Sequence, residues 1–361
     1  MSDATPSSSE APTPSGQCSR LRPRSKNSTA PEPPAPKLTD HTDKLFIEQL
    51  RRTTFPFEFQ NKLDSRWTIG DMLKTIHKTL LDWLEVKQPT KEVIEDPAKF
   101  KSYLKNLNGK IRASHHRPLP EAMELWMKEK CSAKHASRIC YFSRELSIGD
   151  EKLLNNYRPH SAETYGETAL NQLLSICEEL EVGTDDIFAD LGSGVGQTVL
   201  FLSAFAGVKK SIGFEIMQYP SKCAELNRSH FISLMKHLGK APLEIKLIHG
   251  SFLDAEAVEL ITSEATLLFM NNVKFDPPLM LNSENLFKKC KVGTRIISTS
   301  EFVNRGRSPE ASNAWTSQLA SITSTKKLRS VSNNVSWTGL TQQFYLTTIH
   351  SALPTPQPTD Q

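Results

Sequence analysis

In the second half of the chain, short apolar runs of strand length alternate with stretches of helical spacing. We expect strands at 187–191, 210–215, 244–248, 266–270 and 293–298, with helices between them at about 197–206, 220–238, 255–262 and 281–290. Such alternation predicts a parallel sheet covered on both faces, and hence an α/β fold. Two further β-like segments, 328–337 and 343–349, are joined through Thr338-Gly339 and predict a C-terminal β-hairpin at one edge.

Upstream of this region the apolar residues recur three and four positions apart. This spacing predicts amphipathic helices over 69–86 and 98–111, and a third helix that opens at Leu119-Pro120-Glu121. We therefore divide the chain into a disordered Pro- and Ser-rich tail, a smaller mainly helical domain, an α/β domain and a flexible tail, at 1–43, 44–150, 151–350 and 351–361.

Composition adds few restrictions to this outline. With 38% apolar residues, a chain of 361 residues can bury a full core. Since no apolar run could span a bilayer and the N-terminus does not resemble a signal peptide, we expect an intracellular protein without a membrane partner. The six cysteines form no C-x-x-C pair, and Cys131, His135 and Cys140 lack a fourth zinc ligand, so no metal is expected.

The net charge of +4 is unevenly distributed, because the basic excess lies before residue 150. Arg20, Arg22, Arg24 and Lys26 form a cluster that is typical of nuclear import signals or nucleic-acid-binding tails, although such clusters also serve solubility alone. A second basic series is interpreted as a solvated helix face in preference to a phosphate-binding stripe: Lys99, Lys101, Lys105, Lys110, Arg112 and Arg117.

The first candidate for chemistry is the segment 190–197, with the sequence Asp-Leu-Gly-Ser-Gly-Val-Gly-Gln. It follows a buried strand and opens a helix, and its glycines allow a tight turn close to a ligand. The spacing G-x-G-x-G is commoner in S-adenosylmethionine enzymes than in dinucleotide-binding proteins, which usually have G-x-G-x-x-G. The segment therefore predicts a nucleoside-binding turn.

Polar residues at the ends of the next strands extend this site. Glu215 ends the second strand, where a carboxylate can accept hydrogen bonds from both ribose hydroxyls. Ser251 and Phe252 follow the third strand and are candidates for adenine contacts, with core packing as the alternative for Phe252. Asn271 and Asn272 follow the fourth strand, where side-chain amides either hold a carboxylate or form a turn.

Several motifs together identify a family. Leu-Asn-Asn-Tyr at 154–157, Tyr-Gly-Glu-Thr at 165–168, the glycine turn, Phe-x-Asn-Asn at 269–272 and Val-Ser-Trp-Thr-Gly at 335–339 occur in this order. From about residue 153 to 350 the chain resembles the disruptor-of-telomeric-silencing family, the non-SET methyltransferases of histone H3 lysine-79. The resemblance implies a Rossmann-like class I methyltransferase sheet with the hairpin at its C-terminal end, preceded by the helical domain.

The resemblance also implies roles for individual residues. The segment 165–168 would close over the methionine end of S-adenosyl-L-methionine, and Asn271 would lie near its sulfonium. A narrow channel for the substrate lysine would be lined by Asn271, Phe275, Trp337 and Phe344. The cofactor would be bound by Tyr165, Gly166, Glu167, Thr168, Phe188, Ala189, Asp190, Leu191, Gly192, Ser193, Gly194, Val195, Gly196, Gln197, Glu215, Ser251, Phe252 and Asn271.

The chain departs from the family pattern at two of these positions. Ser251 stands where the family usually has Asp, and Phe344-Tyr345 where a Tyr-Tyr pair is expected. The chain is nevertheless expected to be a monomeric nuclear enzyme that methylates histone H3 lysine-79 in nucleosomes, with a weak basic surface toward nucleosomal DNA. The alternatives are a catalytically weak paralogue that binds chromatin or cofactor, and a nicotinamide-dependent oxidoreductase, against which Gln197 counts. No general base is assigned.

Overall fold

The computed structural model describes residues 78–114, 117–118, 121, 130–154, 165–237, 240, 244–302 and 314–352. Within these ranges the central element is a seven-stranded sheet in the order β3-β2-β1-β4-β5-β7-β6. Its first five strands are parallel, and β7 runs antiparallel to both of its neighbours, β5 and β6. The strands are β1 (Ile187–Leu191), β2 (Lys210–Glu215), β3 (Ile245–His249), β4 (Leu267–Met270), β5 (Arg295–Ser298), β6 (Thr323–Lys327) and β7 (Tyr345–Ile349). This confirms the Rossmann-like methyltransferase sheet predicted from sequence.

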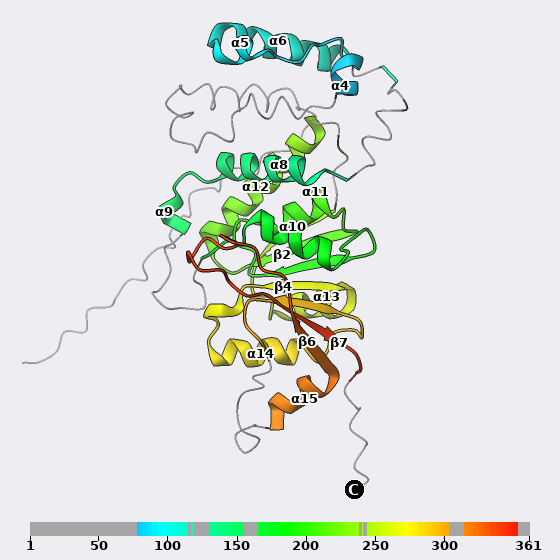
Figure 1. Ribbon diagram of the computed structural model, residues 1–361, viewed down its shortest axis with the longest axis vertical. Helices are drawn as coiled ribbons and strands as arrows, with labels where there is room; N and C mark the ends of the chain where they lie inside the picture. Colours follow the sequence, from blue (N-terminus) through cyan, green and yellow to red (C-terminus); the bar gives the residue numbers. More distant parts are fainter. Residues whose placement is uncertain are drawn as a thin grey trace, which may run out of the picture. The chain divides into compact units, whose positions relative to one another are not determined.

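Helices cover both faces of the sheet, because its central strands are apolar on both sides (Figure 1). One face packs in a common core with α8 (Ala133–Ser147), α10 (Leu170–Glu179), α11 (Gln197–Phe205) and α12 (Gln218–His237). The other face packs with α13 (Ala255–Glu264), α14 (Pro277–Phe287) and α15 (Ala314–Ile322). Alternate residues of β1 belong to the two cores, Phe188 to the first and Ala189 to the second.

The strand register brings the carboxyl ends of four parallel strands to one edge. Asp190 is opposite Gly213 of β2 and Phe269 of β4, and Glu215 is opposite His249 of β3. The residues that follow these strands therefore meet beside the topological switch point, where ligands bind in doubly wound sheets.

The C-terminal hairpin is confirmed, but its first strand was wrongly placed at 328–337. The strand is β6, which comes five residues earlier, and 328–344 is a connecting loop with a single isolated bridge, Thr168 to Val335. Buried side-chain amides bind the backbone of this loop: Gln172 accepts from Val331 N at 2.9 Å, and Asn334 accepts from Gln342 N at 2.9 Å. The loop carries β-like residues without pairing as a strand.

The expected helix at 98–111 is confirmed as α6 (Pro97–Ala113), which is preceded by α5 (Lys91–Glu95). The expected helix at 69–86 is described only from residue 78, and its α4 (Lys78–Trp83) ends before the predicted boundary. The third predicted helix lies largely outside the described residues, as do the basic cluster at 20–26 and most of the Leu-Asn-Asn-Tyr motif. In the described part of the chain, no helix has the length and apolarity required to cross a membrane.

Candidate functional site

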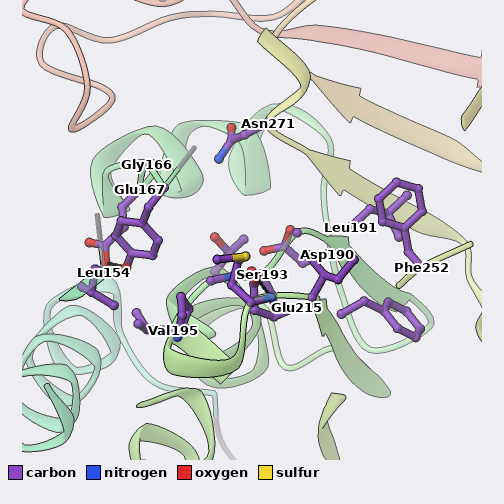
Figure 2. Close-up of a pocket in the computed structure, with 18 of the residues that line it drawn as sticks. Leu154, Gly166, Glu167, Asp190, Leu191, Ser193, Val195, Glu215, Phe252 and Asn271 are labelled. Atoms are coloured by element: carbon purple, nitrogen blue, oxygen red, sulfur yellow. Dashed lines mark hydrogen bonds between the residues drawn. The ribbon is translucent and has the colours of Figure 1, made fainter. Parts of the chain in front are cut away.

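A cavity of about 560 Å³ opens at the carboxyl ends of the parallel strands (Figure 2). Its volume is within the range of small-molecule sites. Most of the predicted cofactor residues line it: Tyr165, Gly166, Glu167, Thr168, Asp190, Leu191, Gly192, Ser193, Gly194, Val195, Gln197, Glu215, Ser251, Phe252 and Asn271, together with Phe275 from the predicted lysine channel. The strand ends and the segment 165–168 thus form one site.

The glycine turn has the backbone conformation that its sequence predicts. All three glycines have positive φ, +114° at Gly192, +54° at Gly194 and +79° at Gly196. At Gly194 a side chain is also excluded by space, since a Cβ would lie 2.9 Å from the ring of Tyr165. Gly196 has a different role, because a Cβ there would meet Leu247 at 2.9 Å and the residue does not line the cavity.

Glu215 supports this turn from the end of β2. Its carboxylate accepts hydrogen bonds from the backbone N–H of Gly194 at 2.8 Å and of Met217 at 2.6 Å. Burial raises the pKa of Glu215, and these two hydrogen bonds oppose the shift. The carboxylate therefore lies in the cavity wall with both oxygens directed by the backbone.

Asp190 is the more deeply buried acid, with 3% of its surface exposed. Burial, followed by repulsion from Glu215, raises the pKa of Asp190 to about 8, although a hydrogen bond with Thr198 acts in the opposite direction. Gln197 also lines the cavity, and its side-chain Oε1 has no hydrogen-bond partner among the described residues. Gln197 Oε1 is therefore available to a polar atom of a ligand, whereas Asp190 already has Thr198 as a hydrogen-bond partner.

The electrostatic character of the cavity is acidic. Among the described residues that line it, the acidic side chains are Glu167, Asp190 and Glu215, and none is Lys, Arg or His. Such a lining suits a cationic ligand and disfavours a pyrophosphate. The lining therefore favours a cationic nucleoside over the nicotinamide dinucleotide among the cofactors that the glycine turn allows.

The segment 165–168 is held by the loop that follows β6. Glu167 N donates to Ser336 Oγ at 2.8 Å, and Ser336 N donates back to the Glu167 carbonyl at 2.9 Å. Gly166 faces the indole ring of Trp337 so closely that a Cβ on it would overlap the ring. Thr168 Oγ1 lies 3.2 Å from Asn271 Oδ1, which connects the segment to the end of β4.

The end of β3 forms the apolar side of the cavity. Phe252 is nearly buried and stacks on Phe275 with 6.3 Å between ring centroids. The hydroxyl oxygen of Ser251 accepts from Leu253 N at 3.1 Å, and the backbone N–H of Ser251 donates to the carboxylate of Asp254 at 3.0 Å. The serine therefore closes a turn and leaves its hydroxyl proton available to a ligand.

Asn271 and Asn272 have separate tasks. Asn271 lines the cavity, whereas Asn272 is buried and accepts from the backbone N–H of Thr299 at 3.0 Å and of Ser300 at 2.8 Å. The amide of Asn272 thus fixes the backbone after β5. Asn272 is thus structural, and a ligand-binding role stays a prediction for Asn271 alone.

Five of the predicted site residues do not line the cavity. Phe188 and Ala189 are fully buried within β1, where they pack on opposite faces of the sheet. Phe344, also fully buried, stacks on Phe269 at 6.3 Å and presents no surface to a channel. Gly196 packs against Leu247 as described above. Trp337 is partly buried over Gly166, outside the cavity lining.

Other lining residues were not predicted. Leu153 and Leu154 come from α9 (Glu151–Leu154), and a run from Ile216 to Pro220 follows Glu215. Ile216 is 55% exposed. Its position directly after the strand-end acid Glu215 could have indicated from sequence that it lies beside the site.

Comparison with known proteins assigns the same region to one family. The family model for "Histone methylation protein DOT1" matches residues 144–349, which include the whole cavity. An H3 lysine-79 specific histone-lysine N-methyltransferase of Caenorhabditis elegans is 38% identical over 231 residues, covering 63% of this chain and 24% of that protein. The Drosophila melanogaster protein of the same description is 33% identical over 213 residues, covering 59% and 11%.

The chain thus spans about a quarter of the length of the first relative and about a tenth of the second. Among solved structures, a putative O-methyltransferase from Klebsiella pneumoniae overlaps with a TM-score of 0.38 at 11% identity, covering 64% of this chain and 95% of that one.

Proposed function

Since the chain belongs to the DOT1 family of histone methylation proteins, we propose that it transfers a methyl group from S-adenosyl-L-methionine to lysine-79 of histone H3 in nucleosomes. The observation that carries the proposal is the overlap of the family match with the acidic cavity. The substrate is inferred from the descriptions of the relatives, and the acidic lining of the cavity is a chemical reason for a cationic cofactor.

The residues present fit this cofactor. S-adenosyl-L-methionine carries a sulfonium and an ammonium, which the carboxylates of Asp190 and Glu215 complement. Glu215 would accept hydrogen bonds from the ribose hydroxyls, and Phe252 would provide an apolar surface for adenine; both residues line the cavity. Segment 165–168 would cover the methionine end, with Asn271 near the sulfonium. When bound, the cofactor supplies an activated methyl group.

The protein's own contribution to the reaction is alignment and desolvation. The substrate amine would have to be neutral to accept the methyl group that the bound cofactor would supply. An ordinary lysine has a pKa near 10.4, and the apolar ring of Phe275 in the cavity wall would favour its neutral form. The departing proton goes to water, and no residue is assigned as general base.

A labelled-methyl assay on nucleosomes tests the proposal. Purified protein is expected to bind the cofactor and to transfer label to histone H3, and nucleosomes whose H3 lysine-79 is replaced by arginine are expected to remain unlabelled. Binding without transfer to any nucleosome would support the weak-paralogue alternative, which Ser251 favours. Absence of cofactor binding would contradict both.

Cofactor affinity is predicted to increase with pH between 6 and 7. Because the pKa of Asp190 is about 8 in the free protein, most molecules must lose this proton before the carboxylate can pair with a cation. Over this range, affinity should rise about ten-fold per pH unit, while the cofactor's own amine, with a pKa of roughly 7.7–8.0, remains protonated. Calorimetry in two buffers of different ionisation enthalpy would detect the released proton.

Asp190→Asn is the matched variant for this prediction. It should bind more weakly at pH 7, and its affinity should lose the pH slope, because the amide does not titrate. A wild-type affinity that does not change between pH 6 and 7 would show that Asp190 is ionised in the free protein or does not face the cation.

We propose further that the chain acts in the nucleus as a monomer, and that its divisions are those expected from sequence: 1–43, 44–150, 151–350 and 351–361. Support for the nuclear location comes from the histone substrate named for the relatives. The basic excess before residue 150 would face nucleosomal DNA. Lys101 and Lys105 of α6 are exposed, while Lys110 is paired with Glu85 at 3.1 Å.

A further inference from the structure

Arg144, in the last turn of α8, connects this helix to segment 165–168. Its side chain is only 12% exposed. The Nε atom donates to both carboxylate oxygens of Glu167, at 2.9 and 3.1 Å. The two terminal nitrogens donate to the carboxylate of Glu151 in α9, at 2.7 and 3.2 Å. One guanidinium therefore holds two carboxylates from different segments, using the planar fork that lysine lacks.

The contact continues from Glu167 to the glycine turn. The hydroxyl of Tyr165 donates to Glu167 Oε1, and the Tyr165 ring occupies the space that a side chain at Gly194 would need. Tyr165 also packs against the small apolar cluster of Leu154, Val195 and Cys223. A continuous series of contacts thus leads from Arg144 through Glu167 and Tyr165 to the turn.

Loss of Arg144 would leave an excess of negative charge at this place. Burial by itself would lower the pKa of Arg144, but attraction by Glu167 and the hydrogen bond with Glu151 outweigh it and raise the pKa. Burial and the neighbouring carboxylates Glu151 and Glu167 raise the pKa of Glu145, while Arg144 lowers it. Without the guanidinium, the partly buried Glu167 would lack its cationic partner and would reorient toward water.

The helix that carries Arg144 is anchored without it. α8 packs on α11 and α12 through apolar residues, including the fully buried Ile139 and Cys140. The backbone N–H of Cys131, just before the helix, donates to the carbonyl of Ala204 in α11 at 2.9 Å. Replacing Arg144 should therefore release the segment 165–168 and leave the position of the helix unchanged.

We infer that Arg144 is a positioning residue for the cofactor site: by holding Glu167 it keeps Tyr165 against the glycine turn, so that the turn and segment 165–168 are arranged before the cofactor binds. The inference rests on the cofactor proposed above. Arg144 itself is not among the residues that line the cavity. A segment that is already ordered binds the ligand more tightly, because binding then does not have to restrict the conformation of the segment.

Calorimetry with S-adenosylhomocysteine and hydrogen exchange of the free protein test the inference together. Arg144→Ala should raise the Kd about ten-fold, and the Glu167 amide, which donates to Ser336, should exchange at least about ten-fold faster without ligand. Arg144→Lys should recover part of the affinity, because it keeps the charge but not the fork. Arg228→Ala is the matched control: it removes an arginine–carboxylate pair, with Glu225 of the same helix at 2.6 Å, and should leave Kd unchanged.

A double-mutant cycle distinguishes positioning from general stability. If Arg144 acts through Glu167, then Glu167→Gln should weaken binding comparably, and the double variant should be no weaker than either single one. Additive losses, or an unchanged Kd and exchange rate in Arg144→Ala, would overturn the inference. Should Arg144→Ala fail to fold, an unchanged Kd in Glu167→Gln would overturn it equally. Failure of the wild-type protein to bind S-adenosylhomocysteine would instead refute the proposed function. The exchange measurement uses the free protein and therefore does not depend on ligand binding.

Discussion

Replacing Glu215 with alanine is expected to weaken S-adenosylmethionine binding at least ten-fold. The carboxylate accepts from the backbone N–H groups of Gly194 and Met217 and is proposed to bind the ribose hydroxyls as well. Hydrogen bonds to charged groups contribute about 1.5–3 kcal/mol each, and a ten-fold change in Kd corresponds to about 1.4 kcal/mol. Loss of the ribose contacts alone would therefore produce the effect, and a less ordered turn would add to it.

Calorimetric titration of the variant provides the measurement. Glu256→Ala, an exposed acid in the first turn of α13, is the control for the loss of one negative charge, and its Kd should match that of the wild type. If Glu215→Ala binds the cofactor as tightly as the wild type does, the carboxylate has no ribose role and serves the turn only.

The second large effect is expected from Gly166→Ala, which should reduce the methylation rate by disturbing how the substrate is positioned. A Cβ at Gly166 would overlap the indole ring of Trp337 at Cε3 and lie 3.2 Å from Cδ2 and Cζ3. The ring or the segment must move, and a displacement of about 1 Å near reacting groups can reduce the rate about 100-fold. We expect kcat/KM for nucleosomes to fall at least ten-fold, and by a larger factor than the affinity for S-adenosylhomocysteine.

Gly339→Ala is the matched control, because it lies in the same loop as Trp337 and a Cβ there meets nothing within 4 Å. It should methylate nucleosomes at the wild-type rate. Steady-state kinetics with both variants, together with thermal unfolding to verify that each is folded, complete the test. A Gly166→Ala protein with unchanged kcat/KM would show that the contact with Trp337 is not required for substrate positioning.

The inner parallel strands β1, β2, β4 and β5 were predictable because they are buried on both faces and therefore have apolar sequences. In β1 every residue after Ile187 is buried, so neither face of this strand is exposed to solvent. The exception is the hairpin. β6 has the polar sequence Thr-Ser-Thr-Lys-Lys and lies at the edge of the sheet, where polar and basic residues are usual, so its sequence does not resemble that of the inner strands.

Prediction was least accurate for contacts between segments distant in sequence. The channel role expected for Phe344 is not supported, because its ring packs on Phe269 from β4, 75 positions earlier, and is fully buried. Conversely, Arg144 belongs to none of the motifs recognised in the sequence, and the motif that contains Ser336 gave no indication of its contact with Glu167. Both contact Glu167, 23 and 169 positions away along the chain, and only the folded arrangement brings them together.

The sequence by itself determined the parallel strands, the glycine turn and the strand-end acids Asp190 and Glu215, because backbone conformation and strand periodicity are encoded locally. Tertiary structure alone decided which of these residues face a common cavity, that the cavity is acidic, and that α8 and the loop 328–344 hold segment 165–168 from two sides. Those properties depend on the register of the sheet and on packing between distant segments, which no local pattern records.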